Sequence, residues 1–189
     1  MKYSLPWLIN RLDEEVRLKY LFFWGHQPRK DGQIGESCFS QWWGAPFTVE
    51  NVVYKTAEHW MMAEKARLFG DEAVLKEILR CKSPGEAKKW GRQVRNFDAA
   101  SWTGQCYDIV RKGNFYKFAQ NQSLKSFLIQ TGERILVEAS PVDAIWGIGL
   151  AADHPNRENP VKWPGRNLLG FALMEVRDML KNTEHRAAE

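Results

Sequence analysis

The chain has 189 residues, a length that fits one domain with a sizeable hydrophobic core. Hydrophobic residues make up 44% and charged residues 26%, and no apolar run approaches the ~20 residues that span a membrane, so a membrane protein is not indicated. The net charge of +4 arises without a long block of Lys and Arg. This balance disfavours a nucleic-acid-binding arm and suits an anionic small molecule equally well.

Several standard sites are absent from the sequence. There is no P-loop, no GxSxG elbow and no complete dinucleotide-binding glycine pattern, and the four histidines lack the spacing of metal ligands. We therefore expect neither a metal nor a cofactor. The three cysteines form no CxxC pair, and the N-terminus is too acidic and too amphipathic for a signal peptide, which favours reduced thiols and a cytoplasmic location.

In chain order, the first elements are a helix, a strand and a hairpin. Apolar residues at helical spacing predict an amphipathic helix over residues 5–19. A buried strand is expected at Tyr20–Trp24, followed by a polar loop over residues 25–37. The two short runs Phe47–Val49 and Val52–Tyr54 predict a hairpin.

The middle of the chain is expected to be helical. A helix is predicted over Tyr54–Phe69, with Thr56 as its N-cap. Three more helices follow, at residues 71–80, at residues 84–90 behind a Ser-Pro-Gly-Glu capping box, and at residues 98–119.

The remaining chain contains a long loop. Residues 140–166 are rich in Pro and Gly, and such a long loop in a compact domain is usually functional. The predicted fold class is α+β, mainly helical, as a single domain over residues 1–189 with a small antiparallel sheet. The other elements expected here are helices at residues 123–130 and 167–181, a strand at residues 135–138, and a flexible tail over residues 182–189.

Two ionisable groups share the inward face of the Tyr54–Phe69 helix. Glu58, Met62 and Lys65 follow one another at i, i+4 and i+7, and Met62 must be buried. Glu58 and Lys65 are therefore either a structural pair or the lining of a site. The helix N-terminus favours an ionised Glu58, and so would a nearby Lys65.

A second carboxylate, Asp143, lies in the long loop within the sequence PVDAIWGIG. Paired carboxylates are typical of enzymes that cleave glycosidic bonds. Taken alone, each residue is better explained structurally, Glu58 as a first-turn helix acid and Asp143 as an Asx-turn residue. The nine tryptophans are likewise expected in the core, although Trp24, Trp90 and Trp146 precede glycines and offer aromatic faces beside open backbone.

Several longer motifs together resemble the YbiA/NADAR family. Their order and spacing agree over roughly residues 20–181, while residues 1–19 lie outside the match. One departure is Gln41, where many members have Asn after the Ser. The motifs are Phe39-Ser40, YKTAEHWMMAEKARLFGD at residues 54–71, Trp90-Gly91-Arg92, Trp102, DAIWGIG at residues 143–149 and GRNLLGFALMEVRDML at residues 165–180.

The resemblance implies an N-glycosidase, a hydrolase acting on N-glycosyl compounds. Two substrate classes are associated with the family: early riboflavin-pathway ribosylamino-pyrimidine phosphates, and guanine bases that carry ADP-ribose, including those in nucleic acid. The sequence leaves both open, and it leaves the oligomeric state open. The alternative is a non-catalytic module that binds ADP-ribose or NAD.

The resemblance marks Glu58, Trp102 and Asp143 as the residues needed for activity, and the chemistry of the bond suggests a role for each. Asp143 is expected to stabilise a cation at the ribose C1 or to activate water, and Glu58 to contact ribose hydroxyls or the leaving group in a protonation state left open. Trp102 is expected to stack on the base or the sugar. Lys65 is either a phosphate contact, a carboxylate partner or a nucleophile. The residues expected to bind substrate are Trp24, Phe39, Ser40, Trp90, Arg92, Trp146, Gly147, Gly149, Arg166 and Asn167.

Overall fold

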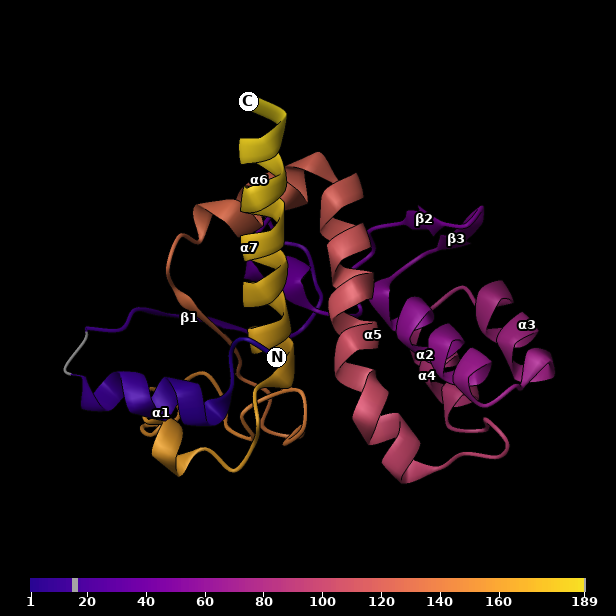
Figure 1. Ribbon diagram of the computed structural model, residues 1–189, viewed down its shortest axis with the longest axis horizontal. Helices are drawn as coiled ribbons and strands as arrows, with labels where there is room; N and C mark the ends of the chain where they lie inside the picture. The colour runs from indigo at the N-terminus through magenta and orange to yellow at the C-terminus, as the bar shows by residue number, and fades with distance from the viewer. Residues whose placement is uncertain (15–16, 189) are drawn as a thin grey trace. The chain divides into compact units, whose positions relative to one another are not determined.

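The computed structural model describes residues 1–14 and 17–188 of the chain (Figure 1). The chain forms two compact units. Unit 1 comprises residues 1–40 and 123–189, and unit 2 comprises residues 41–122. The mainly helical α+β class predicted from the sequence is confirmed.

Unit 2 begins with the predicted hairpin. Strand β2 (Phe47–Val49) pairs antiparallel with β3 (Val52–Tyr54), and Phe47 lies opposite Tyr54. The turn residues Glu50 and Asn51 have φ values of 49° and 64°, the left-handed geometry that a two-residue hairpin turn requires. This pairing is the antiparallel sheet that the sequence predicted.

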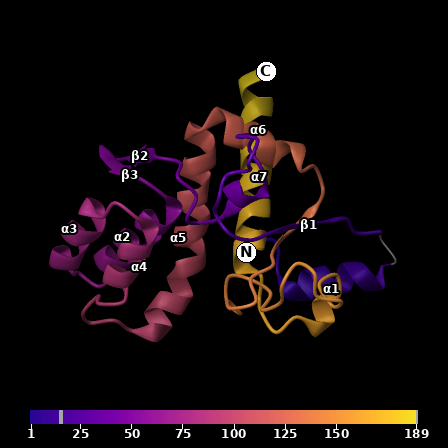
Figure 2. The same cartoon turned by 180° about the vertical axis from the view of Figure 1, so that it is seen from behind.

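Four helices make up the rest of unit 2: α2 (Ala57–Leu68), α3 (Glu72–Arg80), α4 (Pro84–Gly91) and α5 (Ala99–Gln120). The helices α3, α4 and α5 all pack against α2, as Figure 1 and the reverse view in Figure 2 show. Because neighbours cover α2 on several sides, its residues from Ala57 to Ala63 are all buried.

The boundaries of these helices follow from their caps. The Thr56 side chain accepts a hydrogen bond from the His59 N–H at the start of α2. Ser83 and Glu86 form the predicted capping box of α4, and Asp98 caps α5. The rings of Trp60 on α2 and Tyr116 on α5 have centroids 5.7 Å apart, and both contact Phe47 of the hairpin, at 6.3 Å and 6.5 Å.

Unit 1 contains a parallel strand pair. Strand β1 (Tyr20–Phe23) pairs with β4 (Ile135–Glu138), from Tyr20 opposite Ile135 to Phe23 opposite Glu138. The antiparallel sheet predicted from the sequence is therefore the hairpin, and the parallel pair was not predicted. A parallel pair needs a long crossover, and here the connection between the strands includes the whole of unit 2.

The described part of unit 1 contains three α-helices. Helix α7 (Leu168–Ala188) packs against β4 and buries apolar residues such as Phe171 and Val176, and α6 (Gln122–Gln130) precedes β4. The described part of α7 continues past Lys181, so the tail predicted from residue 182 is helical as far as Ala188. No helix in the described part of the chain is both long and apolar enough to cross a bilayer.

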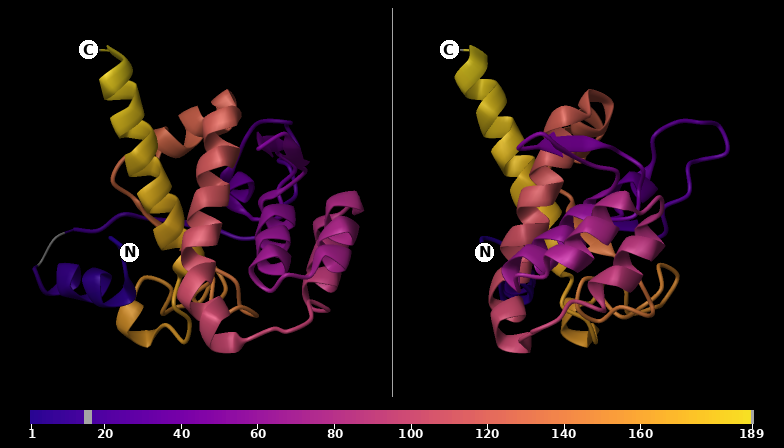
Figure 3. Two further views of the ribbon diagram at one scale, coloured as in Figure 1. Left: turned by 45° about the vertical axis from the view of Figure 1, so that its right-hand side comes forward. Right: turned by 90° about the vertical axis from the view of Figure 1, so that its right-hand side faces the viewer.

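Helix α1 (Leu5–Asp13) is shorter than predicted. Residues 17–19 are not helical, because the Lys19 carbonyl accepts a hydrogen bond from the Ile135 N–H and leads the chain into β1. Residues 15–16 of the predicted helix lie outside the described residues. Helix α1 contacts the 3-10 helix η2 (Pro160–Lys162), which is the only helical turn in the described loop of residues 140–166 (Figure 3). A second 3-10 helix, η1 (Glu36–Phe39), ends the polar loop after β1.

Candidate functional site

Glu58 lies in the first turn of α2 and is only 5% exposed. Its backbone N–H donates to the Gln41 carbonyl at 3.0 Å, which fixes the start of the helix against the preceding segment. Met62, one turn further along, is buried as the sequence predicted. Position in the first turn places the Glu58 carboxylate at the positive end of the helix dipole.

Lys65 lies two turns beyond Glu58 on the same helix. Its ammonium donates to the Gly91 carbonyl at 2.8 Å and lies 4.3 Å from the ring centroid of Phe97 and 5.7 Å from that of Trp102. It forms no ion pair among the described residues. Burial lowers the pKa of Lys65, and no neighbouring charge opposes that shift. The Lys65 ammonium is therefore held by the Gly91 carbonyl and not by the Glu58–Lys65 ion pair considered from the sequence.

Three of the other predicted residues in unit 2 lie on α4 and α5 or just beyond α4. Trp102, in the first turn of α5, is half-buried and faces Lys65. Arg92 caps the end of α4 and is exposed, next to the glycine that accepts the Lys65 hydrogen bond. Trp90 instead lines a hollow with Arg80 and Lys89, so it is not grouped with Lys65.

Unit 2 also contains a buried polar pair that sequence reasoning did not identify as a site. Asn114 on α5 is fully buried, and its Nδ2 donates to Gln41 Oε1 at 2.7 Å and to the Val110 carbonyl at 2.9 Å. Asn114 Oδ1 and Gln41 Nε2 are buried without a hydrogen-bond partner. Each such atom costs about 1–3 kcal/mol, so a bound water or ligand at this position would be stabilised. The signal in the sequence was a polar residue at a core position of a long helix.

In unit 1, the side chain of Asp143 folds its own loop. Its Oδ1 accepts hydrogen bonds from the N–H groups of Ile145 and Trp146, each at 2.8 Å. This is the Asx-turn that the sequence suggested as the structural explanation. The other oxygen, Oδ2, forms no hydrogen bond within the described chain. Oδ1 therefore fixes the carboxylate in the loop, and Oδ2 can accept a further hydrogen bond.

The glycines after Asp143 are needed for the loop itself. Gly149 has a φ of 71°, a conformation that favours glycine, and its N–H donates to the Asp143 carbonyl at 3.2 Å. A Cβ at Gly147 would lie 2.8 Å from the Glu138 carbonyl oxygen. The loop geometry therefore explains both glycines, through the positive φ at Gly149 and the close packing at Gly147.

Asn167 and Phe39 are placed where they support the fold. Asn167 is fully buried, and its side-chain amide accepts from the Glu138 N–H and donates to the Leu136 carbonyl, which ties α7 to β4. Phe39 is also fully buried, with ring centroids of Phe23 and Phe127 each 5.5 Å away. The geometry gives these two residues packing roles, and their substrate contacts stay a prediction from the sequence.

The other predicted binding residues of unit 1 are more accessible. Trp24, directly after β1, is 58% exposed, and Arg166 is exposed while its N–H donates to the Ala144 carbonyl. Trp146 and Ser40 are half-buried. No three His, Cys, Asp or Glu side chains in the described part of the chain gather as metal ligands.

The chain belongs to the NADAR domain family, whose model matches residues 22–181. This confirms the resemblance drawn from the motifs. The chain is 44% identical over 165 residues to N-glycosidase R617 of Acanthamoeba polyphaga mimivirus, which covers 85% of this chain and 95% of that protein. It is 33% identical over 144 residues to N-glycosidase YbiA of Escherichia coli strain K12, covering 76% and 79% of the two chains. The NMR structure of E. coli YbiA superposes with a TM-score of 0.67 at 28% identity and covers 89% of each chain.

Proposed function

We propose that the protein hydrolyses the C1–N bond of a phosphorylated ribosyl heterocycle. The coarse class, an N-glycosidase, is the one named for R617 and for YbiA, its relatives in the NADAR domain family. The observation that carries the proposal is the environment of α2. A buried carboxylate and an ammonium of lowered pKa share this helix, and the ammonium lies beside Trp102.

The chemistry requires positive charge at C1, a neutral leaving heterocycle and an attacking group. Glu58, buried at the start of α2, is assigned to the ribose hydroxyls or to the leaving group. Asp143 is assigned to the cationic C1 or to the attacking water, because its carboxylate is oriented through Oδ1 while Oδ2 stays available. Trp102 is assigned to stacking on the base or the sugar.

We assign Lys65 the role of a nucleophile. An amine attacks only in its neutral form, and burial increases the neutral fraction of Lys65 at a given pH. Its Nζ would bond to C1 as the C1–N bond breaks and the heterocycle leaves with a proton. The resulting glycosylamine opens to an imine, and water then releases the sugar and restores the amine. Phosphate contacts are assigned to the exposed Arg92 and Arg166.

The runner-up function is a binding module for ADP-ribose or NAD, which would need the aromatic residues but neither carboxylate. Binding and turnover separate the two. ADP-ribose affinity is measured for wild type and for Asp143→Asn, next to base release under single-turnover conditions. We expect the variant to bind ADP-ribose within a few-fold of wild type and to lose about 10²-fold or more in rate. ADP-ribose binding by both proteins without base release by either would favour the binding module.

Three substrates distinguish the substrate classes: ADP-ribosylated guanosine, an oligonucleotide with one ADP-ribosylated guanine, and a ribosylamino-pyrimidine phosphate. A metabolite and a modified base both present a ribose, a C1–N bond and a phosphate, so we propose both as substrate classes to be compared. The ratio of kcat/KM values identifies the preferred class. We also propose a cytoplasmic location, because no disulfide joins the three buried cysteines in the described chain.

A further inference from the structure

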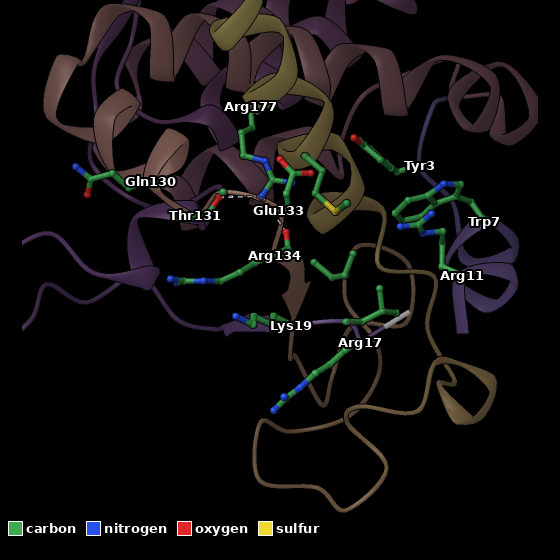
Figure 4. Close-up of a pocket in the computed structure, with 14 residues that line it drawn as sticks. Tyr3, Trp7, Arg11, Arg17, Lys19, Gln130, Thr131, Glu133, Arg134 and Arg177 are labelled. Atoms are coloured by element: carbon green, nitrogen blue, oxygen red, sulfur yellow. Dashed lines mark hydrogen bonds between the residues drawn. The ribbon is translucent and has the colours of Figure 1, made fainter. Parts of the chain in front are cut away.

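We propose that unit 1 contains a second binding site, for a nucleoside phosphate, in a basic cavity beside α1 and α7. The cavity has a volume of about 550 Å³, within the usual range for small-molecule sites. It is shown in Figure 4, and its lining includes Trp7, Arg17, Lys19, Arg134, Met174 and Arg177. None of the residues assigned to glycosidic cleavage lines it.

The charge of the lining favours an anion. Three cations, Arg17, Lys19 and Arg134, are exposed and form no ion pair among the described residues. In Figure 4 they lie on one side of the cavity, opposite Trp7 and Arg11. The acid in the lining, Glu133, pairs with Lys181 at 3.5 Å. Cations gathered in one concavity raise the local potential, which attracts a multiply charged anion.

Arg177 gives the cavity a buried donor. It is only 2% exposed, and its Nη1 donates to Thr131 Oγ1 and to the Arg134 carbonyl, both at 2.8 Å. Its Nε is buried without a hydrogen-bond partner. Figure 4 shows the guanidinium reaching from α7 toward the centre of the lining. The buried guanidinium places a fixed positive charge at the wall of the cavity, which adds to the potential that attracts an anion.

The remaining wall is apolar and aromatic. Trp7, Leu18, Ile135 and Met174 contribute this surface, and Tyr3 fixes Trp7 by an edge-on contact at 4.7 Å between ring centroids. An aromatic wall beside a cluster of cations matches a ligand that combines a planar ring with a phosphate. A nucleoside phosphate has both parts, whether it is a free nucleotide or the phosphorylated end of a nucleic acid strand.

One part of the cavity lining lies outside the residues that the family model matches, and the other part lies within them. The lining residues from Tyr3 to Lys19 precede residue 22, where the NADAR match begins. The site therefore depends on the segment that makes this chain longer than the matched domain at its N-terminal side. It does not rest on the proposed glycosidase activity.

The test is calorimetric titration of the full chain with AMP, with inorganic phosphate and with a 5′-phosphorylated 12-nucleotide DNA strand. The variant is Lys19→Glu/Arg134→Glu, at two exposed positions. The control, Lys30→Glu/Lys76→Glu, makes the same charge change at two exposed cations outside the cavity lining. Trp7→Leu removes the aromatic wall alone.

We expect AMP to bind wild type and control equally and to bind Lys19→Glu/Arg134→Glu at least about tenfold more weakly. Trp7→Leu should weaken AMP more than inorganic phosphate. Tighter binding of the DNA strand, lost in the same variant, would identify a strand end as the source of the nucleoside phosphate. No AMP or DNA binding, or equal binding by both double variants, would overturn the site. Base release should stay at the wild-type rate in all three variants, so failure of this site and failure of the glycosidase are separate results.

Discussion

At the scale of single residues, the proposed mechanism depends mainly on the environment of Lys65. A surface lysine is charged at neutral pH and reacts poorly. Lys65 is half-buried between Phe97 and Trp102, and its hydrogen-bond acceptor is an uncharged carbonyl. Because burial disfavours the ammonium, the pKa of Lys65 falls, and the neutral amine appears at a lower pH than for an exposed lysine.

The first prediction concerns this amine. Lys65→Arg keeps a cation that can reach the Gly91 carbonyl and the two rings, but a guanidinium stays protonated and cannot form the imine. We expect it to lose at least about 10³-fold in base release, and we expect cyanoborohydride to trap wild-type protein covalently on the sugar. Mass spectrometry measures the adduct. If Lys65→Arg stays active and the wild-type protein forms no adduct, Lys65 is a phosphate contact and not the nucleophile.

The second prediction concerns Glu58. Glu58→Gln preserves the size of the buried side chain and replaces the carboxyl with an amide that cannot ionise or transfer a proton, so base release should fall about 10²–10⁴-fold while the fold is retained. Glu72→Gln is the matched control, because Glu72 is a first-turn acid of α3 that is exposed. Circular dichroism checks folding. If both variants retain full activity, Glu58 is only a structural acid.

At the scale of elements, an ion pair fixes the segment that carries Phe97. Asp71 caps α3 by accepting from the Val74 N–H, and its two oxygens also accept from Arg95 through the backbone N–H, Nε and Nη2 at 2.7–3.0 Å. This contact ties the residues after α4 to the start of α3, and Phe97, two residues on, lies over Lys65. Arg95 is therefore ion-paired with Asp71 within unit 2.

The third prediction is a pH dependence of stability. The hydrogen bonds from Arg95 hold the pKa of Asp71 well below its ordinary value of 3.8. The stabilisation is therefore complete above about pH 3.8 and is lost as the pH falls below it, because the unfolded chain takes up the proton first. Urea unfolding from pH 6 to pH 3 measures the free energy. Asp71→Asn should be less stable at pH 6 and lose less on acidification, whereas parallel curves for the two proteins would contradict the assignment.

Elements with local signals were predictable from the sequence, and long-range pairings were not. The starts of α2, α4 and α5 follow from the caps Thr56, Ser83 and Asp98, since a cap needs only residues next to it in sequence. The parallel pairing of β1 with β4 depends on partners far apart in the chain, and no period reveals it. Helix α1 stops early for the same reason, because Lys19 is drawn into a contact with Ile135.

At the scale of the whole molecule, the predicted catalytic residues come from both compact units. Glu58, Lys65 and Trp102 belong to unit 2, and Asp143 belongs to unit 1. The burial of Glu58 was predictable from the apolar residues on its helix face. The partnerless atoms of Gln41 and Asn114 were not, since they depend on the packing of α5. Phe39 and Asn167 were identified as motif residues, but their packing roles became apparent only from their burial.

The measurement that tests the central claim most directly is hydrolysis of the C1–N bond, followed as release of the unmodified heterocycle or nucleoside. Wild-type protein in excess is incubated with ADP-ribosylated guanosine and, separately, with the ribosylamino-pyrimidine phosphate, and the products are identified by mass spectrometry. The account predicts guanosine and ADP-ribose from the first substrate, or the free aminopyrimidine and ribose phosphate from the second, with Glu58→Gln and Asp143→Asn slower by about 10²-fold or more. Intact substrates in both reactions would contradict it.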